Sequence, residues 1–197
     1  EVHNDVVATR VKLNDRRLRF QVGDTDFQLP AIGRHFLTAA LLGIAVAREI
    51  DISDQDIAAA LRHWSPVAGR CQKLPIGPWT VIDDSYNASP AAVVAGCAAL
   101  RQLETEHRRI VVLGDMLELG EQSDTYHAQI GDIVAECEFD GLIAVGAHAS
   151  TVAAAARRRG MDPDCLGACP DLDTALLLLD LWLSPGDAVL VKGSRAM

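Results

Sequence analysis

Hydrophobic and polar positions alternate along the first 30 residues and then change to a longer period. The runs VVATRVKL, RRLRFQV and DFQL are separated by the turn-like NDR and GDT, a pattern typical of antiparallel strands. From Gly33 to Glu49 the apolar residues recur at helical spacing, and Ser53 stands where it can cap a second helix with one apolar stripe. The pattern predicts a partial β-meander over residues 1 to about 30, followed by a two-helix segment.

A different alternation begins at Trp79, after a stretch without periodicity. Residues 65–78 are rich in proline and glycine, which predicts a linker between two domains, 1–77 and 79–197. Beyond it, the β-branched runs TVID, RIVVLGD, GLIAVGA and DAVLVKGS are separated by helix-length segments at 90–104, 122–137, 147–159 and 171–183. Residues 164–168 form a further, weaker strand candidate. The second domain is therefore expected to be α/β and Rossmann-like, with a mostly parallel, doubly wound sheet.

The stretch VIDDSYNASP, residues 81–90, marks a junction between a strand and a helix. Val81 and Ile82 end an apolar run, while Ser89 and Pro90 suit the cap and first position of a helix. Residues 83–87 would then lie at the carboxyl end of a parallel strand, where α/β proteins bind their ligands. From the spacing alone, an ordinary polar loop explains the stretch equally well.

Every strong strand of the second domain ends in glycine or polar residues. Because parallel strands end at one edge of the sheet, these loops are expected to converge on one crevice. Mixed carboxylates and cations there suit a zwitterionic substrate or a ribose. For Asp115 and Glu118, helix capping and loop closure are an equally good explanation. The candidates are Asp84, Asp115, Glu118, Lys192, Ser194 and Arg195.

Composition and charge narrow the classes of function. The net charge of −9 and the lack of a basic, aromatic stripe argue against nucleic-acid binding. No apolar run reaches the roughly 18 residues that a membrane span needs, so membrane insertion is not expected. Five cysteines without a CxxC pair indicate reduced thiols rather than a metal site in this chain. The sequence contains neither GxxxxGK[ST] nor GxGxxG, so we expect no triphosphate cradle here.

Three motifs together resemble a known family. DDSYNASP, VVLGDMLELGEQS with a following histidine, and VLVKGSR have the order and spacing of the Mur ligases of bacterial cell-wall synthesis. GRH at 33–35 and PVAGR at 66–70 fit the region before them. The motifs are most similar to the branch that adds D-alanyl-D-alanine to UDP-N-acetylmuramoyl-tripeptide.

The resemblance implies a fragment of a three-domain enzyme. Residues 1–77 would be the later part of the central ATPase domain, and residues 79–197 the carboxyl-terminal ligase domain. The phosphate loop, the Mg²⁺ ligands and the UDP-sugar domain would precede this chain in the same polypeptide, so the chain alone is expected to be inactive. Such a ligase, of the acid–amino-acid type and in the bacterial cytoplasm, uses ATP to phosphorylate the tripeptide carboxylate. The amine of D-Ala-D-Ala then attacks the acyl phosphate.

The resemblance also implies roles for individual residues. Asp84 would contact the ATP ribose and Arg70 the ATP phosphates, with His35 also on the nucleotide side. The family's HNxxNA, whose asparagines approach adenine, is replaced by HFLTAA, so Phe36 and Ala39 stand at those positions. No residue is assigned as catalytic, although Lys192 is a candidate for an electrostatic role. Tyr86 and Asn87 would lie near both ATP and the dipeptide, and the dipeptide side would be lined by Asp115, Glu118, Lys192, Ser194 and Arg195, with Lys192 or Arg195 meeting its carboxylate.

Two alternatives stay open. One is another Mur ligase or a folylpolyglutamate-type amide ligase with a different amine substrate. The other is a small-molecule-binding module that uses the same crevice without catalysis.

Overall fold

The computed structural model of the protein describes residues 6–196. The first five residues of the predicted meander, which include His3, and the terminal Met197 lie outside the described residues. The chain divides into two compact units, Glu1–Pro66 and Val67–Met197, and each is described by itself.

The first unit contains the predicted meander and two helices. Its three strands pair antiparallel in the order β1-β2-β3, and the apolar residues of β2 and β3 alternate onto the face that the helices cover. Phe20 and Phe27 stack there with ring centroids 5.8 Å apart. The elements are β1 (Ala8–Leu13), β2 (Leu18–Val22), β3 (Thr25–Leu29), α1 (Phe36–Glu49) and α2 (Asp54–His63).

Local side-chain hydrogen bonds account for the turns and caps of this unit. The side-chain oxygen of Asn14 accepts from the backbone N–H groups of Arg16 and Arg17 at 3.0 and 2.8 Å, which closes the β1–β2 turn. The Ser53 hydroxyl accepts from the Asp56 N–H, so the predicted cap of the second helix is confirmed. That helix ends one residue earlier than its apolar stripe indicates, because Trp64 is extended.

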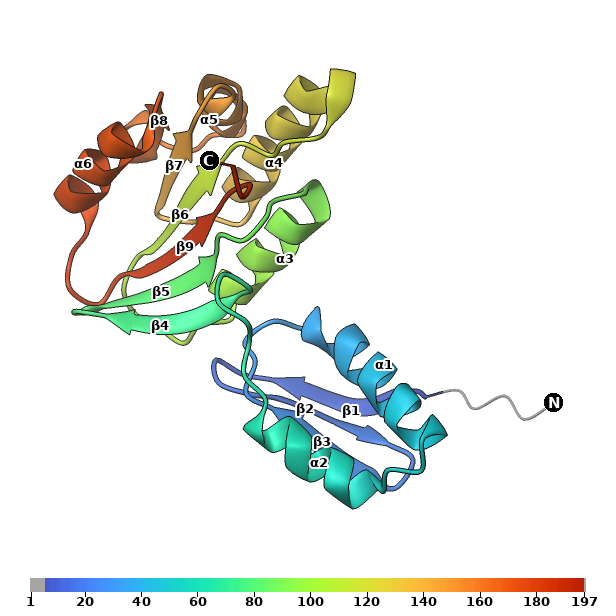
Figure 1. Ribbon diagram of the computed structural model, residues 1–197. Helices are drawn as coiled ribbons and strands as arrows, with labels where there is room; N and C mark the ends of the chain where they lie inside the picture. The colour runs from blue at the N-terminus through green and yellow to red at the C-terminus, as the bar shows by residue number, and fades with distance from the viewer. Residues whose placement is uncertain (1–5, 197) are drawn as a thin grey trace. The chain divides into compact units, whose positions relative to one another are not determined.

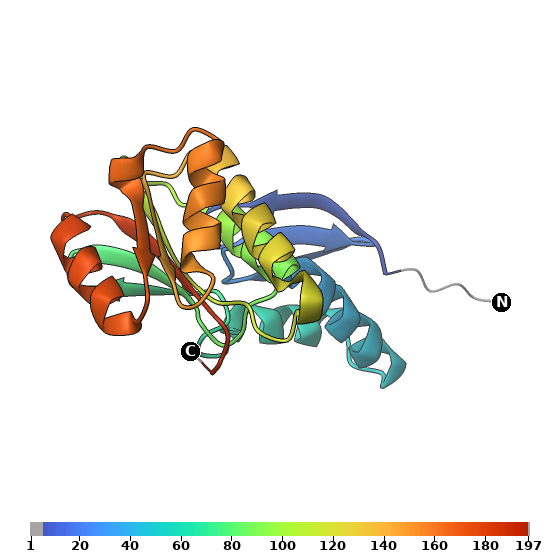
Figure 2. The ribbon, with the colours of Figure 1, turned by 90° about the horizontal axis from the view of Figure 1, so that it is seen from above.

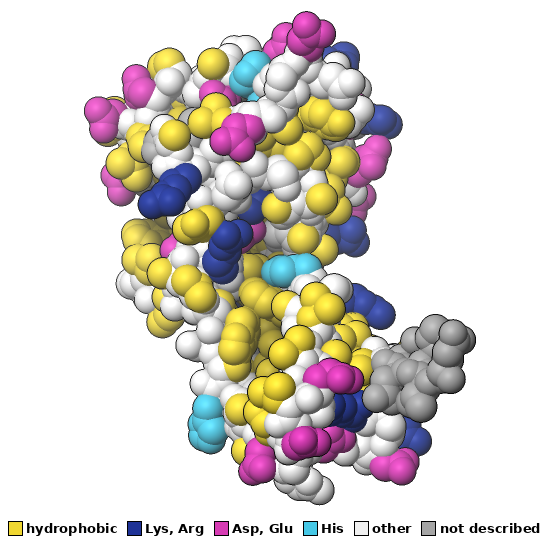
Figure 3. Space-filling model, turned by 45° about the vertical axis from the view of Figure 1, so that its right-hand side comes forward, with side chains coloured by type: hydrophobic (Ala, Val, Ile, Leu, Met, Phe, Trp, Pro, Cys, Tyr) yellow, Lys and Arg dark blue, Asp and Glu magenta, His cyan; other side chains and the backbone are white. Residues whose placement is uncertain are grey.

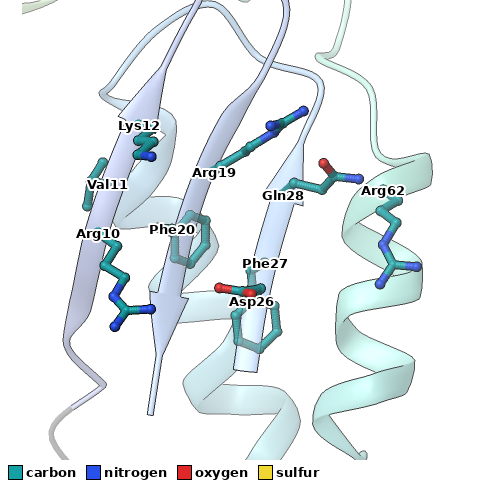
Figure 4. A pocket seen from close by; sticks show the side chains of 9 residues that line it. All are labelled: Arg10, Val11, Lys12, Arg19, Phe20, Asp26, Phe27, Gln28 and Arg62. Carbon is teal, nitrogen blue, oxygen red and sulfur yellow. The ribbon is translucent and has the colours of Figure 1, made fainter. Parts of the chain in front are cut away.

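The other face of the meander is polar and hollowed. Figure 4 shows cationic side chains of neighbouring strands on this face, with Arg62 of α2 beside them. Lys12 lies directly opposite Arg19 across the β1–β2 ladder, and two like charges at such a pair weaken a sheet slightly. The hollow has a volume of about 680 Å³ and is lined by Arg10, Val11, Lys12, Arg19, Phe20, Asp26, Phe27, Gln28 and Arg62.

Helix α1 is apolar on more than its core side. Leu42, Val46 and Ile50 follow each other at four-residue spacing, and each is more than 60% exposed. Figure 3 brings this side of the unit forward and shows hydrophobic side chains on its surface. Helix α1 therefore carries more apolar side chains than the core of the first unit buries.

The second unit is built on a mixed six-stranded sheet in the order β4-β5-β9-β6-β7-β8 (Figure 1). All neighbouring pairs are parallel except β4–β5, so the predicted mostly parallel α/β sheet is confirmed. Strand β7 is buried along its whole length, as expected for a central strand covered on both faces. The strands are β4 (Gln72–Ile76), β5 (Trp79–Asp84), β6 (Arg109–Gly114), β7 (Gly141–Val145), β8 (Leu166–Cys169) and β9 (Ala188–Lys192).

Strand β4 corrects the prediction that residues 65–78 lack regular structure. Pro75 and the flanking glycine and proline residues hide the strand from a reading of periodicity. The structure tolerates Pro75 because β4 lies at the edge of the sheet, where a missing N–H costs no central hydrogen bond.

Helices cover both faces of this sheet. Helices α3, α4 and α5 pack side by side on one face, and α6 covers β7 and β8 on the other (Figures 1 and 2). Gly131 allows the close approach of α4 to α5, since a Cβ there would lie 2.3 Å from the Val152 carbonyl oxygen. The helices are α3 (Pro90–Arg101), η1 (Gly120–Gln122), α4 (Ser123–Glu136), α5 (Ala149–Arg158), η2 (Pro163–Cys165) and α6 (Leu172–Trp182).

We expect Gly131→Ala to destabilise the second unit by about 1–3 kcal/mol, because the steric cost at the α4–α5 contact exceeds the roughly 1 kcal/mol that alanine gains in a helix. Urea unfolding followed by circular dichroism measures the difference. Gly43→Ala in α1 is the matched control, since a Cβ there meets nothing within 4 Å, and it should be stabilising. Equal stability of Gly131→Ala and the unaltered chain would contradict this account of the packing.

Candidate functional site

The carboxyl ends of β5, β9 and β6 lie side by side at one edge of the sheet (Figure 1). The register pairs Asp84 with Lys192 and Lys192 with Leu113, two residues before Asp115. The predicted convergence of the strand ends is therefore a consequence of the strand order. It brings Asp84, Asp115 and Lys192 to the same rim.

Lys192 and Asp84 form a buried ion pair at this rim. The Lys192 ammonium donates to the Asp84 carboxylate at 2.6 Å and to the Asn87 backbone carbonyl at 3.0 Å. The Lys192 side chain is 1% exposed and that of Asp84 is 13% exposed. The pair therefore joins the end of β9 to the end of β5 and to the loop that follows β5.

The second carboxylate oxygen of Asp84 also accepts a hydrogen bond. It accepts from the backbone N–H of Cys71 at 3.0 Å, which ties the segment before β4 to the rim. Burial, assisted by the negative charge of Asp84, raises the pKa of the Cys71 thiol to about 12. Cys71 is therefore a neutral packing residue, and Asp84 keeps only its remaining lone pairs for a ligand.

Tyr86 lies beneath two arginine side chains. The Arg70 guanidinium is 3.9 Å from the centre of the ring and that of Arg195 is 5.7 Å from it. The Tyr86 N–H donates to the Gly69 carbonyl, and Gly69 has φ +73°, where a Cβ would lie 3.0 Å from the Tyr86 backbone nitrogen. Two arginines from near the beginning and the end of the second unit's sequence therefore lie close to the same aromatic ring.

Asn87 and Ser89 shape the start of α3. The Asn87 side-chain oxygen accepts from the Ala88 N–H, while its backbone carbonyl accepts from Lys192. The Ser89 hydroxyl accepts from the Ala92 N–H and Pro90 opens the helix, as the sequence predicts. Much of the polar character of residues 83–90 therefore serves the turn between β5 and α3.

Asp115 closes a loop. Its carboxylate accepts from the N–H groups of Ala147 and His148 at 2.8 and 3.0 Å, joining the end of β6 to the end of β7. Gly146, with φ +111°, is required there because a Cβ would lie 2.5 Å from an Asp115 carboxylate oxygen. The side chain is buried and does not line the hollow at the rim.

A hollow of about 530 Å³ opens between the loops after β5, β6 and β9. Its wall is tied across strands, because the Ser194 hydroxyl accepts from the Leu117 N–H and the Ser194 N–H donates to the Asp115 carbonyl. Glu118 adopts a left-handed backbone conformation with φ +63° at this wall. The lining residues are Tyr86, Asn87, Leu117, Glu118, Ser194, Arg195 and Ala196.

His35 lies in the first unit, immediately before α1. Its ring packs against that of Phe36 with centroids 4.3 Å apart, and Phe36 in turn contacts Trp64 edge-on at 5.1 Å. Phe36 is thus a partly buried residue that packs against that unit's core.

Sequence reasoning did not assign a role to His127, although it is the histidine that follows the GDMLELG motif. The structure buries it completely, with a hydrogen bond from the Met116 N–H.

Within residues 6–196, no group of three or more histidine, cysteine or acidic side chains could hold a metal ion. No helix of the described residues is long and apolar enough to cross a membrane.

Comparison with known proteins agrees with this geometry. Residues 69–195 match the family described as the Mur ligase, glutamate ligase domain. The chain is 37% identical over 217 residues to the UDP-N-acetylmuramoyl-tripeptide--D-alanyl-D-alanine ligase of Mycobacterium tuberculosis strain H37Rv, covering 98% of this chain and 42% of that protein. The ligase of the same name from Bacillus subtilis is 27% identical, over 99% of this chain and 43% of the relative.

Solved structures give the same result. A crystal structure of MurF from Acinetobacter baumannii superposes with a TM-score of 0.87 at 28% identity, over 100% of this chain and 44% of that one. MurF ligase from Thermotoga maritima in complex with ADP, at 22% identity and a TM-score of 0.70 over 96% of this chain and 43% of that one, shares the fold. The chain spans less than half the length of these relatives. With the matched motifs at one rim and the family match over most of its length, the chain belongs to the Mur ligase family.

Proposed function

We propose that this chain is the dipeptide-binding part of an ATP-dependent ligase that joins D-alanyl-D-alanine to UDP-N-acetylmuramoyl-tripeptide in peptidoglycan synthesis in the bacterial cytoplasm. One observation carries the proposal. In a domain that matches the Mur ligase family, the charged residues that line the hollow at the strand ends are one acid, Glu118, and one arginine, Arg195. Neither forms an ion pair with another residue of the described range.

The charges of this hollow suit the dipeptide. D-Ala-D-Ala carries an ammonium and a carboxylate at neutral pH, separated by two α-carbons and the peptide bond between them. Arg195 offers a planar, bidentate partner for the carboxylate, and Glu118 an acceptor for the ammonium. We assign the carboxylate to Arg195 rather than to Lys192, because the buried Lys192 ammonium already donates to Asp84 and Asn87. Lys192 then acts as a positioning residue.

The nucleotide side of the proposal rests on Arg70 and Asp84. ATP would supply the phosphoryl group that activates the tripeptide carboxylate. The exposed Arg70 guanidinium over Tyr86 suits a phosphate, and the Asp84 carboxylate has lone pairs left for a ribose hydroxyl beyond its two existing bonds. Roles for His35 on this side and for Mg²⁺ stay proposals of the same kind. These residues orient the reactants and stabilise charge, without a protein nucleophile.

The proposal predicts that D-Ala-D-Ala binds the chain and that Arg195→Ala weakens binding roughly 10- to 100-fold, since a charge-assisted hydrogen bond contributes about 1.5–3 kcal/mol. Isothermal titration with the dipeptide measures the change. Arg158→Ala, an exposed arginine on α5, is the control and should bind like the unaltered chain. Unchanged affinity in Arg195→Ala would refute the assignment, and absence of any dipeptide binding would count against the function.

The positioning role of Lys192 is tested by stability. Lys192→Met should destabilise the second unit by about 3 kcal/mol, because it leaves the Asp84 carboxylate without its cation in a largely buried place. The double variant Lys192→Met, Asp84→Asn should lose less than the sum of the two single variants, which a double-mutant cycle measures by urea unfolding. A strictly additive cycle would show that the two side chains do not depend on each other.

The chain alone is also expected not to turn over ATP, since its 197 residues contain no GxxxxGK[ST] motif. A phosphate-release assay with UDP-N-acetylmuramoyl-tripeptide, D-Ala-D-Ala and ATP tests this. Phosphate release above the background of a heat-denatured sample would overturn it.

A further inference from the structure

A fully buried histidine holds the loop that forms one wall of the hollow. His127 lies on α4 with 0% of its surface exposed. Its Nε2 accepts from the Met116 backbone N–H at 2.9 Å, and its Nδ1 lies 2.7 Å from the Ser123 carbonyl oxygen. Because an N–H can only donate and a carbonyl can only accept, the hydrogen bonds assign a neutral ring with its proton on Nδ1.

The bond from Met116 is one of two that fix consecutive residues of this loop. The Met116 N–H points to His127 on α4, and the next N–H, that of Leu117, points to the Ser194 hydroxyl beyond β9. Glu118 follows immediately in a left-handed conformation, which its neighbours must hold in place. The loop is thus held by hydrogen bonds to two different elements just before Glu118, which lines the hollow.

His148, Asp115 and Asp124 are the titratable groups close to His127. The ring of His148 stacks on it with centroids 4.1 Å apart, and His148 is paired with Asp124 at 2.9 Å. The Asp115 carboxylate lies 4.0 Å from Nε2. Burial and His148 oppose a proton on His127, whereas the hydrogen bond to the Ser123 backbone and the charges of Asp115 and Asp124 favour it. Burial is the largest effect, so the pKa of His127 is lowered from its ordinary value.

We propose that neutral His127 is a positioning residue for the dipeptide site, and that its protonation releases Met116 and so displaces Leu117 and Glu118 from the wall of the hollow. A proton on Nε2 would face the Met116 N–H, donor against donor, and leave that buried amide without an acceptor. The ligand affected is the one assigned under the proposed function, but the movement of the loop does not require that a ligand be present.

The direction of the pH effect follows from linkage. With the loop in place, His127 binds its proton less readily than when the loop is released. The hydrogen-bonded form is therefore fully favoured above the ordinary histidine pKa of about 6.5 and loses its advantage as the pH falls below that value.

Nuclear magnetic resonance on the unliganded chain tests the proposal. At pH 7.5 the His127 ring nitrogens should show the neutral form with the proton on Nδ1, and the Met116 amide should exchange slowly with solvent. Between pH 7.5 and 5 the Met116, Leu117 and Glu118 amide resonances should shift together. Resonances that stay fixed over this range, or a His127 ring that is charged at pH 7.5, would overturn the proposal.

Variants separate the two histidines. His127→Gln keeps an acceptor but does not titrate, so it should remove the pH dependence of the Glu118 resonance. His127→Leu removes the acceptor, and its Met116 amide should exchange at least tenfold faster at pH 7.5 while β7 amides stay unchanged. His148→Gln is the matched control and should keep both the slow exchange and the titration. If the pH dependence of the Glu118 resonance disappeared in His148→Gln but persisted in His127→Gln, it would come from His148, and the proposal would be wrong.

Binding of D-Ala-D-Ala gives a separate readout. Affinity should fall at least tenfold in His127→Leu at pH 7.5 and stay within twofold of the unaltered chain in His127→Gln. If no form of the chain binds the dipeptide, the proposed function fails, while the resonances of Met116 and Glu118 still decide the role of His127. An affinity that is unchanged in His127→Leu, with Met116 exchanging fast, would refute the link to the site.

Discussion

The buried pair of Lys192 and Asp84 is the interaction on which the site depends. It joins the ends of two adjacent parallel strands, and through the Asn87 carbonyl and the Cys71 N–H it also holds the loops on either side of β5. Removing either side chain would leave the other charge largely buried without its partner, so each charge requires the other. Because it holds the ends of β5 and β9 and the loop after β5 together, the pair constrains where Tyr86 and Arg195 can lie.

Backbone hydrogen bonds to side chains extend this arrangement along the rim. Asp115 accepts two N–H groups from the β7–α5 turn, Ser194 accepts one from Leu117, and His127 accepts one from Met116. Loops normally satisfy such groups with water, which leaves them mobile. Here buried side chains take the place of water, so a wall built of loops can still present Glu118 in a defined position. Pre-organisation of this kind lowers the entropic cost of ordering the loops when a small ligand binds.

Much of the fold could be predicted from local pattern, because each strand of the parallel sheet carries its own β-branched run and each helix its own period. Strand β4 could not, since a proline at an edge position disrupts the pattern without disrupting the strand. The candidate site was predictable to the level of which residues meet, because parallel strand ends must share an edge. The role of each residue could not be predicted, since a sequence does not show that Lys192 pairs with Asp84 or that Asp115 accepts hydrogen bonds from a backbone turn. Those facts depend on side-chain direction and burial.

Side-chain direction and burial also give the cations of the site different roles. Lys192 has the reach and charge to meet a carboxylate, yet its compact ammonium is surrounded by three fixed oxygens of Asp84 and Asn87. Arg70 and Arg195 are exposed and lie over one aromatic ring, a contact that does not use their N–H donors. The ligase activity proposed above would require a phosphorylated carboxylate and an amine to be brought together without trapping either. Exposed arginines over Tyr86 can engage and release anions, whereas the buried lysine can only keep the surrounding loops in place.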